Sequence, residues 1–215
     1  MVGILCALPR ELAPLRKRQP AGCRILAAGI GAQAAERGAR LLAQSEPLTA
    51  LISAGYAGGL VQAAAPGTIV VDTKDEELEK FLPPALRGKI VQAGRMVRTP
   101  AERARLAEET GAVAVDMESE AVARVAAESG LPFAAVKAVT DGPQADLVMD
   151  WSRFLRPDGS VRTAAALWSV LRTPKGIAEL RQLWYASGKA SQALSAFLAD
   201  FLERWSARPG APMRK

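Results

Sequence analysis

Acidic side chains stand at several points where an apolar stretch of this sequence ends. They are Glu11, Asp116, Glu118, Glu120 and Asp141. A carboxylate in such a position can accept both hydroxyls of a vicinal diol, as ribose presents, and a carboxylic acid can donate a proton. Open α/β sheets bind their ligands at the carboxyl ends of their strands. These acids therefore predict a ligand site with acid–base chemistry.

Each acid also has a purely structural interpretation. Acids in a first helical turn favour the helix dipole, which would account for Asp116, Glu118 and Glu120. Asp141 would serve as the N-cap of a helix, and Glu11 taken alone would be a surface residue. The set of acids indicates catalysis more strongly than any one of them.

The chain of 215 residues contains no histidine. That absence excludes Ser-His-Asp and Cys-His catalysis and histidine-ligated zinc. The two cysteines, Cys6 and Cys23, form no CxxC motif and fit small apolar positions in strands. Acid–base chemistry must then fall to Asp, Glu, Lys, Tyr or Cys. We expect no metal ion and no organic cofactor.

Two glycine-rich segments could bring a ligand close to the backbone. The first, GIGAQA at 29–34, has a GxGxxA pattern, but the acidic residue that a dinucleotide site needs about 20 positions on is missing. The start of the helix after Gly31 remains suited to an anion or a hydroxyl. The second segment, SAGYAGG at 53–59, is also compatible with a tight loop required only for packing.

Short apolar stretches alternate with helical patterns over the first 145 residues. Strands are expected over 2–7, 24–28, 49–53, 67–71, 112–115 and 131–139, and helices over 32–44, from Thr99-Pro100 onward, and over 117–129. Residues 72–88 are expected to form a surface excursion. From about 144 only helices are expected, near 161–171, 175–186 and 189–205. The alternation predicts an α/β fold with a largely parallel sheet covered on both faces.

The net charge of +6 is unevenly distributed. Residues 151–215 hold 11 Lys/Arg and 4 Asp/Glu, which gives +7, and the first 150 residues sum to −1. The basic, aromatic-rich C-terminal helices could contact anionic lipid, or could simply pack with solvated basic faces. No apolar run approaches the ~20 residues that span a bilayer. We expect a cytoplasmic protein that binds no nucleic acid, with peripheral membrane contact as an option.

The motifs ALPREL, AAGIGAQAA, SAGYAGG, VDMES and VTDG follow one another along the chain. This series resembles the nucleoside phosphorylase and methylthioadenosine/adenosylhomocysteine nucleosidase superfamily over residues 2–145. The resemblance implies a three-layer α/β/α phosphorylase/hydrolase-like fold with a helical C-terminal extension. We expect a single domain over 1–206, with a catalytic core at 1–145, the extension at 146–206 and a disordered tail at 207–215.

The resemblance also implies roles for individual residues. Asp141 matches the acid that protonates N7 of a departing purine, and Glu118 matches the carboxylate that holds the ribose hydroxyls. Glu11 matches the glutamate that positions or activates an attacking water. The neighbouring positions expected to line the substrate and the phosphate or water pocket are Arg10, Gly31, Gly55, Tyr56, Ala57, Gly58, Met96, Val97, Asp116 and Met117.

The chain departs from the family pattern in two places. Tyr56 stands where a small Ser or Cys is usual, which would narrow the pocket or alter its nucleophile. Residues 72–95 are shorter than in typical members, which affects the loop near the base and the contacts of an expected homodimer.

The C-terminal quarter, with FLRPDG at 154–159 and TAAALWSVLRTP at 163–174, resembles the hopanoid-associated phosphorylases. That resemblance implies release of adenine from adenosylhopane, with inorganic phosphate or water as the attacking group. Two alternatives stay open. One is a hydrolase of methylthioadenosine, adenosylhomocysteine or futalosine, and the other is a non-catalytic module that binds nucleosides.

Overall fold

The computed structural model describes residues 1–147 and 174–209, and gives the backbone alone for 174–184. The helical elements are η1 (Pro9–Leu12), α1 (Ala13–Arg18), α2 (Ala32–Ser45), α3 (Glu76–Phe81), α4 (Pro100–Thr110), α5 (Ser119–Glu128) and α7 (Pro174–Ser206). The strands are β1 (Val2–Cys6), β2 (Cys23–Ala27), β3 (Ala50–Gly59), β4 (Ile69–Thr73), β5 (Leu86–Arg87), β6 (Ile90–Gln92), β7 (Ala114–Asp116) and β8 (Phe133–Asp141).

The strands form one mixed sheet in the order β2-β1-β3-β8-β4-β5. Strands β2, β1, β3 and β8 run parallel, and β4 lies antiparallel to β8. The short β7 pairs antiparallel with the end of β3 and parallel with β6. The carboxyl ends of β1, β3 and β8 therefore lie together at one edge of the sheet.

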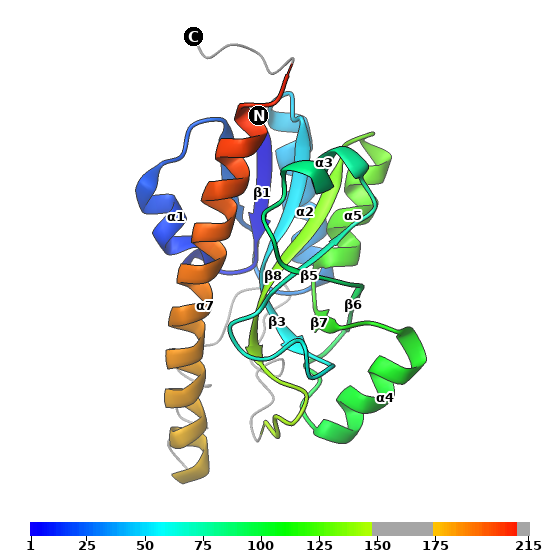
Figure 1. Cartoon of the computed structure of the whole chain (residues 1–215), viewed down its shortest axis with the longest axis vertical. Coiled ribbons are helices and arrows are strands. Elements are labelled where there is room, and N and C mark those ends of the chain that lie inside the picture. Colours follow the sequence, from blue (N-terminus) through cyan, green and yellow to red (C-terminus); the bar gives the residue numbers. More distant parts are fainter. Residues whose placement is uncertain (148–173, 210–215) are drawn as a thin grey trace.

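Helices cover both faces of this sheet, as Figure 1 shows. On one face Leu5 and Leu51 pack with buried side chains of α2 and α5. On the other face Ile4, Ile52 and Val136 pack with buried residues of α7. Neighbouring residues of a strand point to opposite faces, which explains why Ile4 and Leu5 belong to different clusters. The predicted α/β fold with helical layers is confirmed.

The structure corrects three details. The segment SAGYAGG is not a loop but the last seven residues of the ten-residue strand β3. Residues 72–88, expected to form a surface excursion, hold the end of β4, the helix α3 and the strand β5, and both strands belong to the sheet. The helices expected over 175–186 and 189–205 are one continuous helix, because Gly188 and its neighbours keep helical geometry within α7.

Several expectations fall outside the described residues. They concern the helix near 161–171 and the segments 154–159 and 163–173 that carry the resemblance to the hopanoid-associated group. Of the expected tail, residues 207–209 follow the end of α7, and 210–215 are again outside the described part.

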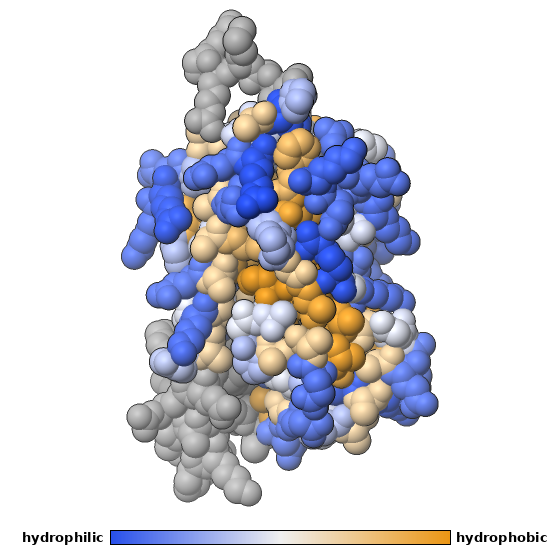
Figure 2. Space-filling model, in the orientation of Figure 1, coloured by the Kyte–Doolittle hydropathy of each residue, from blue (hydrophilic) through white to orange (hydrophobic). Residues whose placement is uncertain are grey.

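The surface in the view of Figure 2 is mostly hydrophilic, with a band of apolar side chains across the middle, over β5 and β6. In the part of the chain that the structure describes, no helix combines the length and apolar character needed to cross a bilayer.

Candidate active site

A buried lysine lies at the centre of the carboxylates. Lys137 extends from the middle of β8 with 1% of its surface exposed, and its Nζ lies 2.7 Å from Oδ2 of Asp116. Asp116, the last residue of β7, also accepts hydrogen bonds from the backbone N–H and the hydroxyl of Ser119. Because both Asp116 oxygens already have donors, its geometry suits a residue that fixes Lys137 and the start of α5.

Glu118 stands beside this pair and is buried. Its Oε1 accepts a hydrogen bond of 2.7 Å from the N–H of Gly31, at the start of α2. Burial, and next the charge of Asp116, raise the pKa of Glu118 to about 7, although Lys137 opposes them. Gly31 has φ 93, a left-handed conformation that favours glycine. The N-terminus of α2 is thus occupied by a carboxylate oxygen in this structure.

Glu11 ends the turn after β1 and is also buried. Its Oε2 accepts hydrogen bonds of 2.9 Å from the N–H groups of Ala7 and Leu8. Burial raises the pKa of Glu11, while those hydrogen bonds and Lys137 partly offset the rise. A side chain at Gly55 would place its Cβ 3.2 Å from the Glu11 carboxylate, and Gly55 has φ +154. Glycine at position 55 therefore lets β3 pass directly against this acid.

Asp141 is the last residue of β8, and its carboxylate is held on both oxygens. Arg103 of α4 forms an ion pair with Oδ2, and the hydroxyl of Thr140 donates to Oδ1 at 2.6 Å. Arg103 has 1% of its surface exposed. A Cβ on Gly58 would lie 2.7 Å from Arg103 Nη1 and 3.1 Å from Asp141 Oδ2, so glycine is needed there.

Tyr56 connects β3 to α7 next to Glu11. Its hydroxyl donates to the carbonyl of Ser187 at 2.9 Å. Burial, and next the charge of Glu11, raise the pKa of Tyr56 to about 12, so the phenol stays a hydrogen-bond donor. Ser191 Oγ donates to the carbonyl of Arg10 at 3.0 Å. Arg10 itself is exposed, and α7 is thus fastened to both β3 and η1 beside the acid.

The remaining expected positions fall around these groups. The carbonyl of Val97 accepts from Arg103 at 2.9 Å, which brings the segment before α4 next to Asp141. Ala57 is buried at the end of β3, and its carbonyl lies 3.5 Å from Thr140 Oγ1. Met117 is half-buried beside Glu118. Half-buried Met96 precedes Val97, and no described contact joins Met96 to the acids.

The arrangement separates two kinds of chemistry along β8. Lys137, Glu118 and Glu11 interact electrostatically as one buried group. Asp141 lies four residues further along the strand, about 13 Å at 3.3 Å per residue. A molecule with a diol at one end and a proton-accepting ring at the other could bridge the two. Among the described residues, no group of three or more Cys, Asp or Glu side chains is placed to hold a metal ion.

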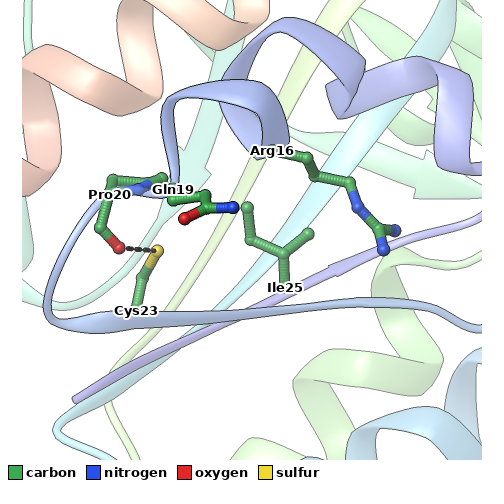
Figure 3. A pocket seen from close by; sticks show the side chains of 5 residues that line it. All are labelled: Arg16, Gln19, Pro20, Cys23 and Ile25. Carbon is green, nitrogen blue, oxygen red and sulfur yellow. Dashed lines mark hydrogen bonds between the residues drawn. The ribbon is translucent and has the colours of Figure 1, made fainter.

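A separate surface pocket lies away from these acids, between α1 and β2. Figure 3 shows its lining residues Arg16, Gln19, Pro20, Cys23 and Ile25. The Cys23 thiol donates to the carbonyl of Pro20 at 3.5 Å, and burial raises its pKa to about 11, so the thiol stays protonated. This pocket contains none of the acids expected to do chemistry.

Sequence reasoning missed two charged residues of the site. Lys137 could have been found, because a single lysine inside the apolar run of β8 must be buried and therefore paired. Arg103 carries no such signal, because α4 is rich in charged residues that mostly face solvent. Only the folded chain shows that this arginine turns inward.

Residues 71–171 match the model of the phosphorylase superfamily, and this segment includes Glu118 and Asp141. A search of curated proteins finds no match. Among solved structures, the chain is similar to the native futalosine hydrolase of Helicobacter pylori strain 26695. That pair has 15% identity and a TM-score of 0.70, with 94% of this chain and 97% of the other covered.

Two further solved structures share the fold. One is a 5′-methylthioadenosine/S-adenosylhomocysteine nucleosidase from Colwellia psychrerythraea 34H in complex with adenine, at 16% identity, 94% coverage of each chain and TM-score 0.68. The other is the S-adenosylhomocysteine nucleosidase of Streptococcus pyogenes in complex with 5-methylthiotubericidin, at 16% identity, TM-score 0.70 and coverage of 94% and 95%. Residues 71–171 are thus similar to the phosphorylase superfamily, and the chain as a whole shares its fold with these solved structures.

Proposed function

We propose that this protein is an enzyme that breaks the N-ribosidic bond of an adenine nucleoside. The observation that carries the proposal is the placement of Glu11, Glu118 and Asp141 on three different chain segments at one edge of the sheet, with Glu11 and Glu118 buried. Isolated burial of carboxylates is unfavourable, so such a cluster indicates a functional site. The solved structures with this fold include nucleosidases bound to adenine and to nucleoside analogues.

The reaction divides the work between the two ends of the site. Glu118 accepts the ribose hydroxyls, with Met117 beside the sugar. The bond between the anomeric carbon and the purine nitrogen breaks with its electron pair going to the base. Asp141, which first takes up a proton from solvent, gives that proton to N7 and returns to the carboxylate that pairs with Arg103. The nucleophile bonds to the anomeric carbon from the opposite face, as an oxocarbenium-like transition state requires.

Water is the nucleophile that the charges favour. Glu11 is a buried carboxylate that can take a proton from water as its oxygen attacks. For phosphate, Arg10 would be the nearby cation, but it is exposed and stands next to Glu11. The N–H of Gly31, which could have bound an anion, is engaged by Glu118. Adenine release that requires added inorganic phosphate would overturn this preference.

For the substrate we propose adenosylhopane, on the resemblance of the C-terminal quarter to the hopanoid-associated group. A large apolar group on the 5′ carbon needs an open path beside the sugar, and α7 reaches the site there through Tyr56. A small 5′ group, as in methylthioadenosine, is the second candidate, because the solved structures with this fold act on such nucleosides. Adenine release from each compound, with and without phosphate, discriminates the two.

The central test replaces each carboxyl group by an amide, which keeps the shape of the side chain but cannot act as an acid. Asp141→Asn and Glu118→Gln should each lower kcat for adenine release by at least about 100-fold while circular dichroism stays that of the wild type. Glu120→Gln is the matched control, because Glu120 is an exposed glutamate in the first turn of α5, two residues after Glu118. Full activity of both variants would show that neither acid takes part in the reaction, whereas nucleoside binding by the wild type without adenine release would leave a non-catalytic binding module as the better description.

We also propose that the protein forms a homodimer and contacts membranes peripherally. A homodimer predicts a mass in solution of about twice 22.7 kDa by light scattering. Peripheral contact of the basic C-terminal segment with membranes predicts sedimentation with vesicles that contain anionic lipid and not with neutral ones.

A further inference from the structure

We propose that Tyr56 is a positioning residue for Glu11, a role that rests on the proposed function of Glu11 as the base for the attacking water. Through Tyr56, attack on the anomeric carbon depends on the docking of helix α7. Tyr56 is the single large side chain in the segment SAGYAGG of β3, and it packs against the core cluster that contains α7. Its backbone and its side chain contact different parts of the molecule.

The backbone of Tyr56 faces the carboxylate of Glu11. Burial raises the pKa of Glu11, and the N–H groups of Leu8, Ala7 and Tyr56 oppose that rise as hydrogen-bond donors. Leu8 and Ala7 precede Glu11 in the same turn, whereas Tyr56 belongs to β3. The preceding Gly55 allows this approach, because a Cβ there would lie 3.2 Å from Oε2 of Glu11. The position of Tyr56 therefore decides where β3 holds the carboxylate.

The side chain of Tyr56 reaches α7. Its hydroxyl donates to the carbonyl of Ser187 at 2.9 Å. Ser187 lies inside α7, where a carbonyl already accepts from the N–H four residues on, so this bond is not needed to complete the helix. The Ser191 hydroxyl is a further hydrogen-bond partner of the phenol, and it donates to the carbonyl of Arg10 at 3.0 Å. Because Arg10 directly precedes Glu11, α7 is connected to the acid from two sides.

Three serines of α7 make these contacts from one face of the helix. Ser187, Ser191 and Ser195 are spaced by four residues, so they lie in a row along α7. They contact in turn β3, η1 and α1, the last because the N–H of Leu15 donates to Ser195 Oγ at 3.2 Å. Ser191 and Ser195 are buried, and a buried hydroxyl without a partner is unfavourable. Docking of α7 is therefore coupled to the arrangement of β3 and η1 around the acid.

This coupling acts on the attack and not on the binding of the sugar. A base must point at the water when the bond to the anomeric carbon forms, and a displacement of about 1 Å can lower a rate by about 100-fold. Phenylalanine at position 56 keeps the aromatic ring and the backbone N–H, but it cannot bond to Ser187. Glu118, which holds the ribose hydroxyls, is bonded to Gly31 of α2 and not to α7. Loss of the Tyr56 hydroxyl should therefore lower kcat and leave KM unchanged.

The experiment is a double-mutant cycle on adenine release, with whichever of adenosylhopane and methylthioadenosine the wild type cleaves. Tyr56→Phe should lower kcat by about tenfold and change KM by less than about twofold. In the Glu11→Gln background the same change should have no further effect, because a residue that acts through Glu11 then has no base to position. Ser191→Ala should also lower kcat, and Ser191→Thr, which restores a hydroxyl, should recover most of the loss.

Tyr185→Phe is the matched control, because Tyr185 lies on α7 with 66% of its surface exposed and should keep the wild-type kcat. If Tyr56→Phe does not fold, Ser191→Ala takes its place in the cycle. Losses that multiply when Tyr56→Phe is combined with Glu11→Gln, a loss confined to KM, or no loss would each overturn the inference. If Glu11→Gln releases no measurable adenine, the kcat–KM split and the recovery by Ser191→Thr decide. Failure of the wild type to release adenine, or full activity of Glu11→Gln, would contradict the proposed function instead.

Discussion

At the scale of single residues, the site places several carboxylates in the protein interior, where a charged group is unfavourable. Glu11, Asp116 and Glu118 are all buried, and one lysine, Lys137, faces them. Burial lowers the pKa of Lys137, but the surrounding carboxylates outweigh burial and hold that pKa above its ordinary value. Residues arranged for chemistry in this way commonly reduce the stability of the fold.

Glu118→Gln should therefore stabilise the protein at neutral and alkaline pH while it removes activity. The folded protein holds the Glu118 proton up to a pKa of about 7, above the unfolded value near 4.5. Between these values the folded state binds more protons than the unfolded state, so wild-type stability falls as pH rises through that window. Urea unfolding should show the variant equal to wild type near pH 4 and more stable by roughly 1–3 kcal/mol at pH 8.

The control for this effect is Glu108→Gln, an exposed acid on α4. A stability difference between Glu118→Gln and wild type that is the same at both pH values would show that titration of Glu118 is not its cause.

Lys137→Met should strongly destabilise the fold, in contrast to Glu118→Gln. The change leaves Asp116 buried without its cation, a loss of about 3–5 kcal/mol in the free energy of unfolding. Arg204→Met, which breaks the exposed pair with Asp200 on α7, should lose less than about 1 kcal/mol. Equal urea midpoints for the two variants would show that the buried ion pair contributes no more to stability than the exposed one.

At the scale of elements, the sequence predicts what depends on local patterns. The apolar runs locate β1, β2 and β8 to within about two residues, and Thr99-Pro100 marks the start of α4. The glycine-rich half of β3 could not be predicted as a strand, because its extended backbone depends on pairing with β8 along its length. The antiparallel direction of β4 likewise follows from its partner and not from its own residues.

The same division holds for the candidate site. The acids at strand ends were visible because each interrupts or ends an apolar run. Their partners were not, since the pairing of Arg103 with Asp141 joins residues 38 positions apart through the placement of a whole helix. Asp141 also shows a limit of local rules. It could have been a helix cap, but it is the final residue of β8 and bonds to side chains.

Thr99→Ala tests how firmly α4 is held at its start. Thr99 Oγ1 accepts from the N–H of Glu102 at 3.2 Å, and the Glu102 carboxylate accepts from the N–H of Thr99 at 3.2 Å. Loss of the threonine hydroxyl should lower the free energy of unfolding by about 1 kcal/mol in urea titration. Glu108→Ala, at an exposed position of the same helix, should change it by less than about 0.5 kcal/mol. A Thr99 variant no less stable than the Glu108 variant would contradict the cap.

At the scale of the whole molecule, one helix completes the core. The largest cluster combines residues of β1, β3 and β8 with residues of α7, and Phe201 and Trp205 stack within it. Trp205 also meets Phe81 of α3 edge-on. The first strand and the last helix thus share a single core, so the described parts should unfold together.

Phe201→Ala measures this shared core. Phe201 is completely buried, and its truncation should cost about 3–5 kcal/mol, seen as one cooperative transition at lower urea concentration. Leu41→Ala is the comparison, because Leu41 is 58% exposed on α2 and should shift the midpoint little. Two separate transitions in Phe201→Ala would mean that α7 and the sheet are independent units.

The hydrogen bonds that join η1 and α1 to α7 have a consequence for how the protein is made. Arg10 and Leu15 bond to Ser191 and Ser195, residues about 180 positions later in the chain. A ribosome produces Glu11 about 180 residues before the part of α7 that supports its surroundings. The nascent chain therefore carries this carboxylate without its cover until α7 has emerged. Nucleoside cleavage should begin only once α7 has been released and docked.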